Sequence, residues 1–182
     1  MFKKLLIRIA TGLKKRQFDY MLIGGQAVLL YGEPRFTKDI DITLAAGAER
    51  LHEILQLAKS FRWKVLVKSP ASFVKKTMVL PFLDPSGIRI DFIFSFSPYE
   101  RQAMGRVKKV RLGKTEVSFA SLEDLVIHKI IAGRPRDLED VKSVLLKNPR
   151  FDKNYIQRWL HKFEKTMAQP FLKRFEEIRK SH

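Results

Sequence analysis

The sequence contains no cysteine. This absence excludes disulfide bonds and zinc sites built on cysteine, and it is compatible with a reducing compartment. No run of apolar residues approaches the roughly 20 that a membrane-spanning helix needs. Residues 1–16 carry lysine and arginine on both sides of a short apolar stretch, which favours an amphipathic helix over a signal peptide. We therefore expect a cytoplasmic protein that does not enter a membrane.

Acidic residues are scarce as well. The chain has 19 Asp and Glu against 36 Lys and Arg, which gives a formal net charge of +17. The basic surplus divides almost equally between residues 1–91 and 92–182, so it is not confined to a tail. A field of this sign concentrates polyanions at the surface and favours nucleic acid as a partner. A lysine-rich but otherwise ordinary exterior is the alternative.

Bulky apolar residues are plentiful, and their spacing predicts a globular α+β fold. Hydrophobic residues make up 45% of the chain and include 14 Phe, enough for a substantial core. Periodicity predicts helices over 2–16, 26–32 and 48–60. It predicts strands over 20–23, 39–44, 63–67, 74–83 and 88–96.

Two turn signals predict hairpins and a change to helix. The "DPSG" turn at 84–87 joins the strands on either side of it, and residues 107–119 form a second hairpin that turns at Gly113. From Ser121 the pattern becomes helical, with Ser121 suited to the N-cap. We expect a core domain over 1–119 and a helical C-terminal segment over 120–182 that packs on it.

Three aspartates occupy matching places on two predicted strands. Asp39 and Asp41 lie two residues apart in "DIDITL" and so project from one face, while Ile40 and Ile42 face the core. Asp91 has the same setting in "IRIDF" and joins the pair if the two strands are neighbours. Converging carboxylates repel one another unless a cation lies between them. Magnesium suits such all-oxygen sites, although an isolated "DID" is most often ordinary surface.

A paired glycine precedes the first two aspartates. Gly24 and Gly25 end a predicted strand and open a predicted helix, where backbone N–H groups and the helix dipole attract phosphate. An ordinary glycine turn is the alternative. The glycine pair and the carboxylates together are more specific than either feature alone.

This combination resembles the polymerase-beta-type nucleotidyltransferase superfamily. The segments "RFTKDID" (35–41) and "EDLVIHKIIAGRPRDLEDV" (123–141) are similar to its AbiEii-like branch, known mostly as toxins of toxin–antitoxin and phage-abortive systems. The resemblance covers roughly residues 20–145. It implies a nucleotidyltransferase-like mixed β-sheet flanked by helices, a nucleoside triphosphate substrate, magnesium, and transfer of a nucleotidyl group.

The resemblance also implies a role for each matching position. The catalytic residues would be Asp39, Asp41 and Asp91, which would hold two magnesium ions, with Asp91 also acting as the base. The nucleotide-binding residues would be Gly24, Gly25, Arg35, Thr37, Lys129 and Asp137. Among these, the glycine amides would hold the triphosphate and Lys129 would neutralise its charge.

Two departures from the superfamily bear on the substrate. Gly24-Gly25 stands where much of the superfamily has Gly-Ser, so one hydroxyl contact to phosphate is missing. The large C-terminal domain of longer members is also missing, which leaves acceptor recognition open.

Three functions remain after other chemistries are set aside. Scattered histidines argue against zinc, and the serines lack triad partners. The first function is transfer to RNA, with tRNA the natural acceptor. The alternatives are a non-catalytic nucleotide-binding, RNA-binding or antitoxin-partner module, and transfer to a protein hydroxyl. Aromatic residues of the C-terminal segment are interpreted as core rather than as an RNA-stacking surface.

Overall fold

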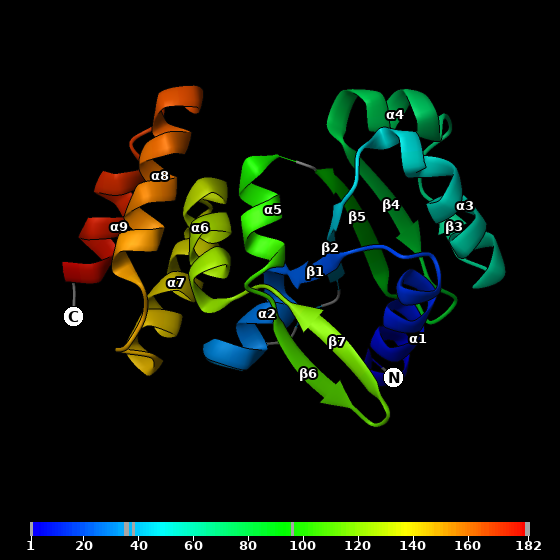
Figure 1. The fold of residues 1–182 in the computed structure, drawn as a ribbon, viewed down its shortest axis with the longest axis horizontal. Coiled ribbons are helices and arrows are strands. Elements are labelled where there is room, and N and C mark those ends of the chain that lie inside the picture. Colours follow the sequence, from blue (N-terminus) through cyan, green and yellow to red (C-terminus); the bar gives the residue numbers. More distant parts are fainter. Residues whose placement is uncertain (1, 35–36, 38, 96, 181–182) are drawn as a thin grey trace.

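The computed structural model describes residues 2–34, 37, 39–95 and 97–180 (Figure 1). The predicted phosphate contact Arg35 lies outside the described residues. The described strands form one mixed sheet with the order β3-β4-β5-β2-β1-β7-β6. They are β1 (Tyr20–Ile23), β2 (Asp39–Ala45), β3 (Lys64–Val65), β4 (Val79–Leu83), β5 (Arg89–Ser95), β6 (Lys108–Leu112) and β7 (Thr115–Phe119).

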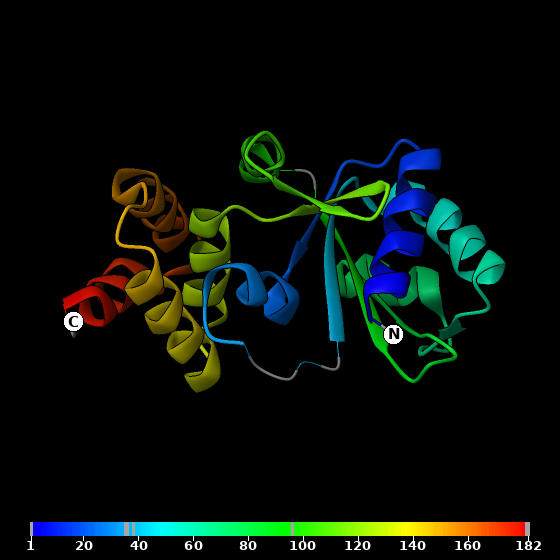
Figure 2. The same ribbon diagram turned by 90° about the horizontal axis from the view of Figure 1, so that it is seen from below.

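Helices flank the sheet on both sides and extend beyond it. They are α1 (Phe2–Lys15), α2 (Gly24–Tyr31), α3 (Leu51–Ser60), α4 (Pro70–Thr77), α5 (Pro98–Met104), α6 (Leu122–Ala132), α7 (Pro135–Lys147), α8 (Lys153–Met167) and α9 (Phe171–Lys180). Figures 1 and 2 show α1 and α3 on one side of the sheet, with α2 and the bundle α6–α9 on the other. No helix in the described part of the chain has both the length and the apolar character to cross a membrane.

The predicted α+β class and both hairpins are confirmed. β4 pairs antiparallel with β5, and β6 pairs antiparallel with β7. Gly113 between the latter strands has φ +66°, which glycine adopts without strain. Ser121 caps α6 by accepting a hydrogen bond of 3.1 Å from the backbone N–H of Asp124.

One predicted strand is wrong over its first half. Residues 74–83 were expected to be extended, but Pro70–Thr77 is helical and the strand begins only at Val79. Pro70 is at the start of α4, where its fixed φ suits a helix and its missing N–H costs nothing. Met78 then ends α4 in the left-handed conformation with φ +56°. The strand expected over 63–67 is also shorter, since only Lys64–Val65 pairs.

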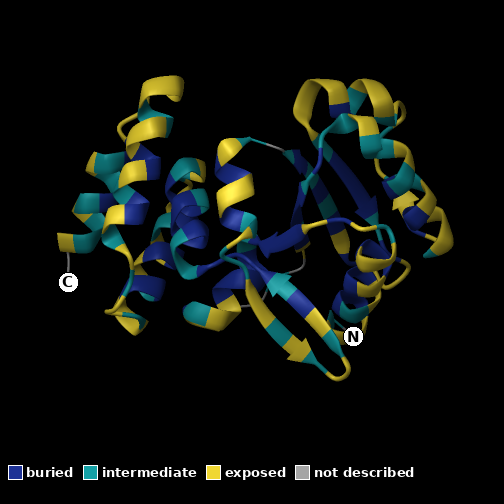
Figure 3. Ribbon diagram, in the orientation of Figure 1, coloured by how far each residue is buried: buried dark blue, intermediate teal, exposed yellow. Residues whose placement is uncertain are grey.

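The C-terminal aromatic residues belong to the core, as predicted. Tyr155, Trp159, Phe171 and Phe175 are buried, and Figure 3 shows buried and exposed residues alternating along α8 and α9. The Tyr155 hydroxyl donates a 2.8 Å hydrogen bond to the buried carboxylate of Asp124 and so joins α8 to α6. The domain boundary at residue 119 stays a prediction.

Candidate active site

The two strands that carry the predicted carboxylates are parallel neighbours in the centre of the sheet. Their register sets Asp41 directly beside Asp91, and Asp39 beside Arg89. The alternate residues Ile40 and Ile42 are fully buried, so the aspartates share the opposite face. The structure therefore places Asp41 and Asp91 side by side, with Asp39 two residues away on the same face of β2.

Negative charge at this place is only partly balanced. Burial raises the pKa of the Asp41 carboxyl above its usual range, and the nearby carboxylates of Asp91 and Asp39 raise it further. Arg89 Nε donates to Asp91 Oδ1 at 2.8 Å, which engages one oxygen of that carboxylate. Since Arg89 was not among the predicted residues, this ion pair is an addition from the structure.

Gly24 is required by the position of Asp41. Gly24 has φ +62°, a conformation that other residues adopt only with strain. A Cβ atom built on it would overlap Oδ2 of Asp41, so no side chain fits without displacing that carboxylate. The glycine turn and the central aspartate are thus one packing unit.

The N-terminus of α2 beside this turn has no side-chain cap. Ile23 is at the N-cap position and makes no side-chain hydrogen bond to the first turn of the helix. An uncapped first turn leaves backbone N–H groups available to a phosphate or another anion. Gly25 belongs to this turn and is buried.

The other end of α2 is fastened to the C-terminal helices. The Tyr31 hydroxyl donates to the carbonyl oxygen of Ala120 at 3.0 Å. Asn148 Nδ2 at the end of α7 donates to the carbonyl oxygen of Tyr31 at 2.7 Å. These contacts fix α2, and with it the glycine turn, against α6 and α7.

Lys129 and Asp137 lie in a buried ion cluster between α6 and α7. The Lys129 ammonium is 2.6 Å from Asp137 Oδ1 and 2.9 Å from Asp140 Oδ2, and its side chain is 7% exposed. Its charge also reaches Asp41, where it opposes the other influences and lowers the pKa. Direct phosphate contacts by Lys129 and Asp137 stay predictions, because both side chains are engaged with each other.

Arg134 is the residue of this region that the sequence argument missed. Its Nε donates to Asp137 Oδ2 at 2.5 Å, yet 76% of its side chain is exposed. It is close enough to Asp41 that its charge lowers the pKa of that carboxyl. The "RPRD" segment contained the signal, but which arginine faces the carboxylates depends on where α7 begins.

Thr37 lies beside the start of β2. Its hydroxyl donates a 3.3 Å hydrogen bond to the carbonyl oxygen of Asp39. This contact braces the approach to the strand, and the nucleotide-binding role of Thr37 stays a prediction.

The donor set at the carboxylates suits magnesium. Within the described ranges, no three acidic or histidine side chains form a ready-made metal-binding group. The available donors are nevertheless all carboxylate oxygens, which magnesium prefers. Burial and then the charges of Asp91 and Asp39 raise the pKa of Asp41, and a bound cation would relieve the repulsion among these carboxylates. The ligand roles of Asp39, Asp41 and Asp91 stay predictions.

Solved structures with a similar fold include a nucleotidyltransferase-like protein, an antibiotic-resistance factor and an adenylyltransferase. The antibiotic-resistance factor ANT(2'')-Ia has a TM-score of 0.61 and 15% identity, and the match covers 99% of this chain and 97% of that chain. An antigenic nucleotidyltransferase-like protein from Paracoccidioides brasiliensis has a TM-score of 0.57 and 18% identity, with 91% and 88% covered. The lincosamide antibiotic adenylyltransferase LnuA has a TM-score of 0.56 and 16% identity, with 78% and 94% covered. Likeness at this identity establishes the fold.

Sequence comparison adds the family. No curated relative matches the chain. The family profile described as nucleotidyl transferase AbiEii toxin, type IV TA system, matches residues 4–180. Because this match spans nearly the whole sequence, the protein belongs to the AbiEii family of nucleotidyltransferases, enzymes that use a nucleoside triphosphate.

Proposed function

We propose that this protein is a magnesium-dependent nucleotidyltransferase that moves a nucleotidyl group from a nucleoside triphosphate to an RNA acceptor, with tRNA the first candidate. The observation that carries the proposal is the carboxylate pair Asp41 and Asp91, in register on neighbouring strands and packed against Gly24. An acidic pair beside an uncapped helix N-terminus suits a substrate that combines phosphates with a divalent cation.

In this proposal, some residues of the chain bind the triphosphate and magnesium, and one accepts the proton of the acceptor hydroxyl. The first N–H groups of α2, at Gly24 and Gly25, bind the triphosphate. The carboxylates of Asp39, Asp41 and Asp91 would hold magnesium, which when bound neutralises phosphate charge. An RNA hydroxyl oxygen forms a bond to the α-phosphorus as the bond to pyrophosphate breaks. Asp91 accepts the proton of that hydroxyl.

Arg134 supplies the exposed positive charge for the triphosphate. Its Nε donates to Asp137 Oδ2 and its Nη2 to Asp137 Oδ1 at 3.4 Å, while 76% of the side chain stays exposed near enough to Asp41 to lower the pKa of that carboxyl. Lys129 contributes indirectly, through Asp137 and Asp41. It fixes Asp137 at 2.6 Å and its charge favours the ionised form of Asp41.

Charge supports a nucleic acid acceptor. The net charge of +17 attracts a polyanion, whereas transfer to a protein hydroxyl gains nothing general from it. RNA and nucleoside triphosphates are both present in the cytoplasm, where we expect the protein to act. The family assignment to a type IV toxin–antitoxin system further suggests an antitoxin counterpart.

Label transfer tests the function directly. Purified protein is incubated with each α-labelled nucleoside triphosphate, magnesium and total RNA, beside the Asp39→Asn/Asp41→Asn variant. We expect label in RNA only with magnesium and intact aspartates. Full transfer by the variant would overturn the mechanism. Label in protein would favour the protein-hydroxyl alternative, and RNA binding in EDTA without any transfer would favour a non-catalytic module.

A further inference from the structure

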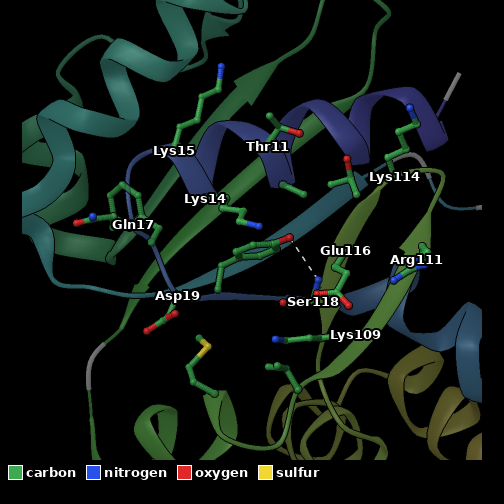
Figure 4. Close-up of a pocket in the computed structure, with 16 residues that line it drawn as sticks. Thr11, Lys14, Lys15, Gln17, Asp19, Lys109, Arg111, Lys114, Glu116 and Ser118 are labelled. Atoms are coloured by element: carbon green, nitrogen blue, oxygen red, sulfur yellow. Dashed lines mark hydrogen bonds between the residues drawn. The ribbon is translucent and has the colours of Figure 1, made fainter.

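A second region of the surface has a charge opposite to that of the carboxylates. A groove of about 1140 Å³ lies between α1, the start of β1 and the β6–β7 hairpin (Figure 4). This volume exceeds the roughly 300–1,000 Å³ of a small-molecule pocket, so the groove suits a larger partner.

The groove exists because two parallel strands separate. β1 and β7 pair only at Leu22 and Phe119, next to the active-site end of β1. Toward the start of β1, a side chain links the two strands instead: the Tyr20 hydroxyl accepts a 3.3 Å hydrogen bond from the backbone N–H of Ser118 (Figure 4). Tyr20 is buried, and the opening forms above it.

Basic side chains predominate along the groove. Figure 4 shows Lys14 from α1 and Lys109 from β6 extending toward it from opposite walls, while Lys15 points away at the rim. The basic residues of the lining are Lys14, Lys15, Lys109, Arg111 and Lys114, and its acidic residues are Asp19 and Glu116. The five basic side chains are exposed, and none forms an ion pair with a described residue.

The basic residues on each wall of the groove can be explained by the stability of their own helix or strand, but their position on facing walls cannot. Lys14 lies in the last turn of α1, where a cation favours the helix dipole. Lys109 and Arg111 lie on β6, the edge strand, where charge discourages pairing with another chain. Glu116 is the cross-strand neighbour of Arg111, yet it forms no ion pair with a described residue. Neither reason requires the two sets of cations to face one another across a groove.

We propose that this groove binds the phosphodiester backbone of the RNA acceptor, with Lys14, Lys109 and Arg111 as phosphate contacts. The inference rests on the proposed function for the identity of the partner. It adds a docking surface away from the reacting groups. The groove is at the start of β1 and Asp41 is beside its end, about 10 Å farther along the strand at 3.3 Å per residue.

The lining predicts contact with phosphates rather than reading of bases. Its aromatic residues, Phe18 and Tyr20, are buried and offer no face for base stacking. Lysine and arginine contacts to phosphates set the position of a nucleic acid without selecting its sequence. Binding at the groove should therefore be tight at low salt and indifferent to sequence.

RNA affinity in matched charge variants tests the groove. The probe is a fluorescein-labelled mixed-sequence RNA, titrated in EDTA without nucleotide at several salt concentrations. The groove variants are Lys109→Gln/Arg111→Gln and, separately, Lys14→Gln on the opposite wall. The control is Lys75→Gln/Lys76→Gln on α4, an exposed basic pair outside the groove that removes the same two charges.

We expect the β6 double variant to lose about 5- to 10-fold in affinity at low salt. Its slope of log affinity against log salt should fall by about 1.5, because each phosphate contact contributes roughly 0.7–0.9. Lys14→Gln should lower the slope by about half as much, and the control should bind like the unmodified protein. Equal RNA affinity of the groove and control variants would overturn the proposal. Aggregation of the β6 variant with unchanged RNA affinity would also overturn it, because the β6 charges would then serve only to protect the edge strand.

Two further measurements separate this proposal from the proposed function. In label transfer, groove variants should raise KM for RNA and leave KM for the nucleoside triphosphate unchanged. Transfer to RNA with unaltered KM in those variants would refute the groove while leaving the function intact. Groove-dependent RNA binding without transfer would refute the function alone. Displacement of RNA by polyglutamate at lower concentration than by unlabelled RNA would identify an acidic protein as the occupant and overturn the RNA assignment.

Discussion

Two groups of ionised side chains meet near α2, and their charges are balanced differently. Between α6 and α7, Lys129 and Arg134 face Asp137 and Asp140, with N–O distances of 2.5–2.9 Å. On the sheet, by contrast, Arg89 forms an ion pair with Asp91, and Asp39 and Asp41 form no ion pair with a described residue.

This difference in charge balance distinguishes a structural ion cluster from a candidate binding site. The balanced cluster has its counter-charges within the chain and holds two helices together. The carboxylate group has fewer of them, and burial together with the charges of Asp91 and Asp39 raises the pKa of Asp41. An arrangement that costs stability is retained where function needs it, so the unbalanced group is the better candidate for chemistry.

Breaking the balanced cluster should give the largest effect. Lys129→Met would leave Asp137 and Asp140 buried with less cationic compensation, and removal of one partner of a buried pair costs about 3–5 kcal/mol. Urea denaturation should show this loss in the free energy of unfolding. The control Lys142→Met, exposed on α7, should change it by less than about 0.5 kcal/mol. A similarly small change in the free energy of unfolding of Lys129→Met would mean that the ion cluster does not stabilise the packing of α6 against α7.

Removing one charge from the carboxylate group should abolish most activity without unfolding the protein. Asp41→Asn deletes a proposed magnesium ligand, and we expect transfer to fall by about 10²–10³-fold, the loss typical of a single electrostatic stabiliser. Initial rates at saturating nucleotide measure this effect, and circular dichroism checks the fold. Activity within a few fold of the unmodified protein would show that Asp41 is not needed for the chemistry.

Two neighbouring arginines, Arg134 and Arg136, test which residues of the ion cluster also act at the carboxylate group. Arg134 is tied to Asp137 and electrostatically coupled to Asp41, whereas Arg136, two residues on, is exposed and has no ion pair with a described residue. We expect Arg134→Gln to raise KM for the nucleoside triphosphate roughly tenfold, by loss of one charge-assisted contact. Arg136→Gln should leave it unchanged. Equal effects of the two variants would remove Arg134 from the site.

The smallest expected effect has the opposite sign, because Asp41→Asn should stabilise the metal-free protein. The raised pKa means that ionised Asp41 is disfavoured in the folded state. The contribution of Asp41 to the free energy of unfolding is most favourable at pH values below its pKa in the unfolded chain. That contribution is lost as pH rises through its pKa in the folded protein. At neutral pH in EDTA we therefore expect the variant to gain about 1 kcal/mol, within the usual range for such substitutions.

Thermal unfolding at several pH values checks this gain. The advantage of Asp41→Asn should shrink as pH falls below the folded pKa of Asp41. Magnesium should raise the Tm of the unmodified protein more than that of the variant. A variant that is less stable than the unmodified protein in EDTA at neutral pH would contradict the assigned repulsion.

Local pattern was sufficient where one element decides the outcome. Alternation in "DIDITL" and "IRIDF" identified which residues face the core, and Ser121 marked the start of a helix. It failed at residues 74–77, because "VKKTMVL" (74–80) looks extended. There Pro70 at the helix start and Val74 as the buried contact favour a helix instead.

Contacts between distant elements could not be read from spacing. Asp91 joins Asp41 only because β5 pairs with β2 in one register, and a shift by one residue would separate them. The burial of Lys129 depends on how α6 packs against α7, and Arg134 gained its place through the same packing.

The sequence by itself indicated the family, singled out three aspartates and a glycine pair as the candidate site, and fixed a net charge that suits a polyanion. These follow from residue identity, near-neighbour spacing and the sum of charges. Only the tertiary structure decided that Gly24 must lack a side chain because of Asp41, that Lys129 is neutralised within the fold, and that cations converge where β1 and β7 separate. Those outcomes depend on which strands pair and which helices touch, and no local pattern encodes them.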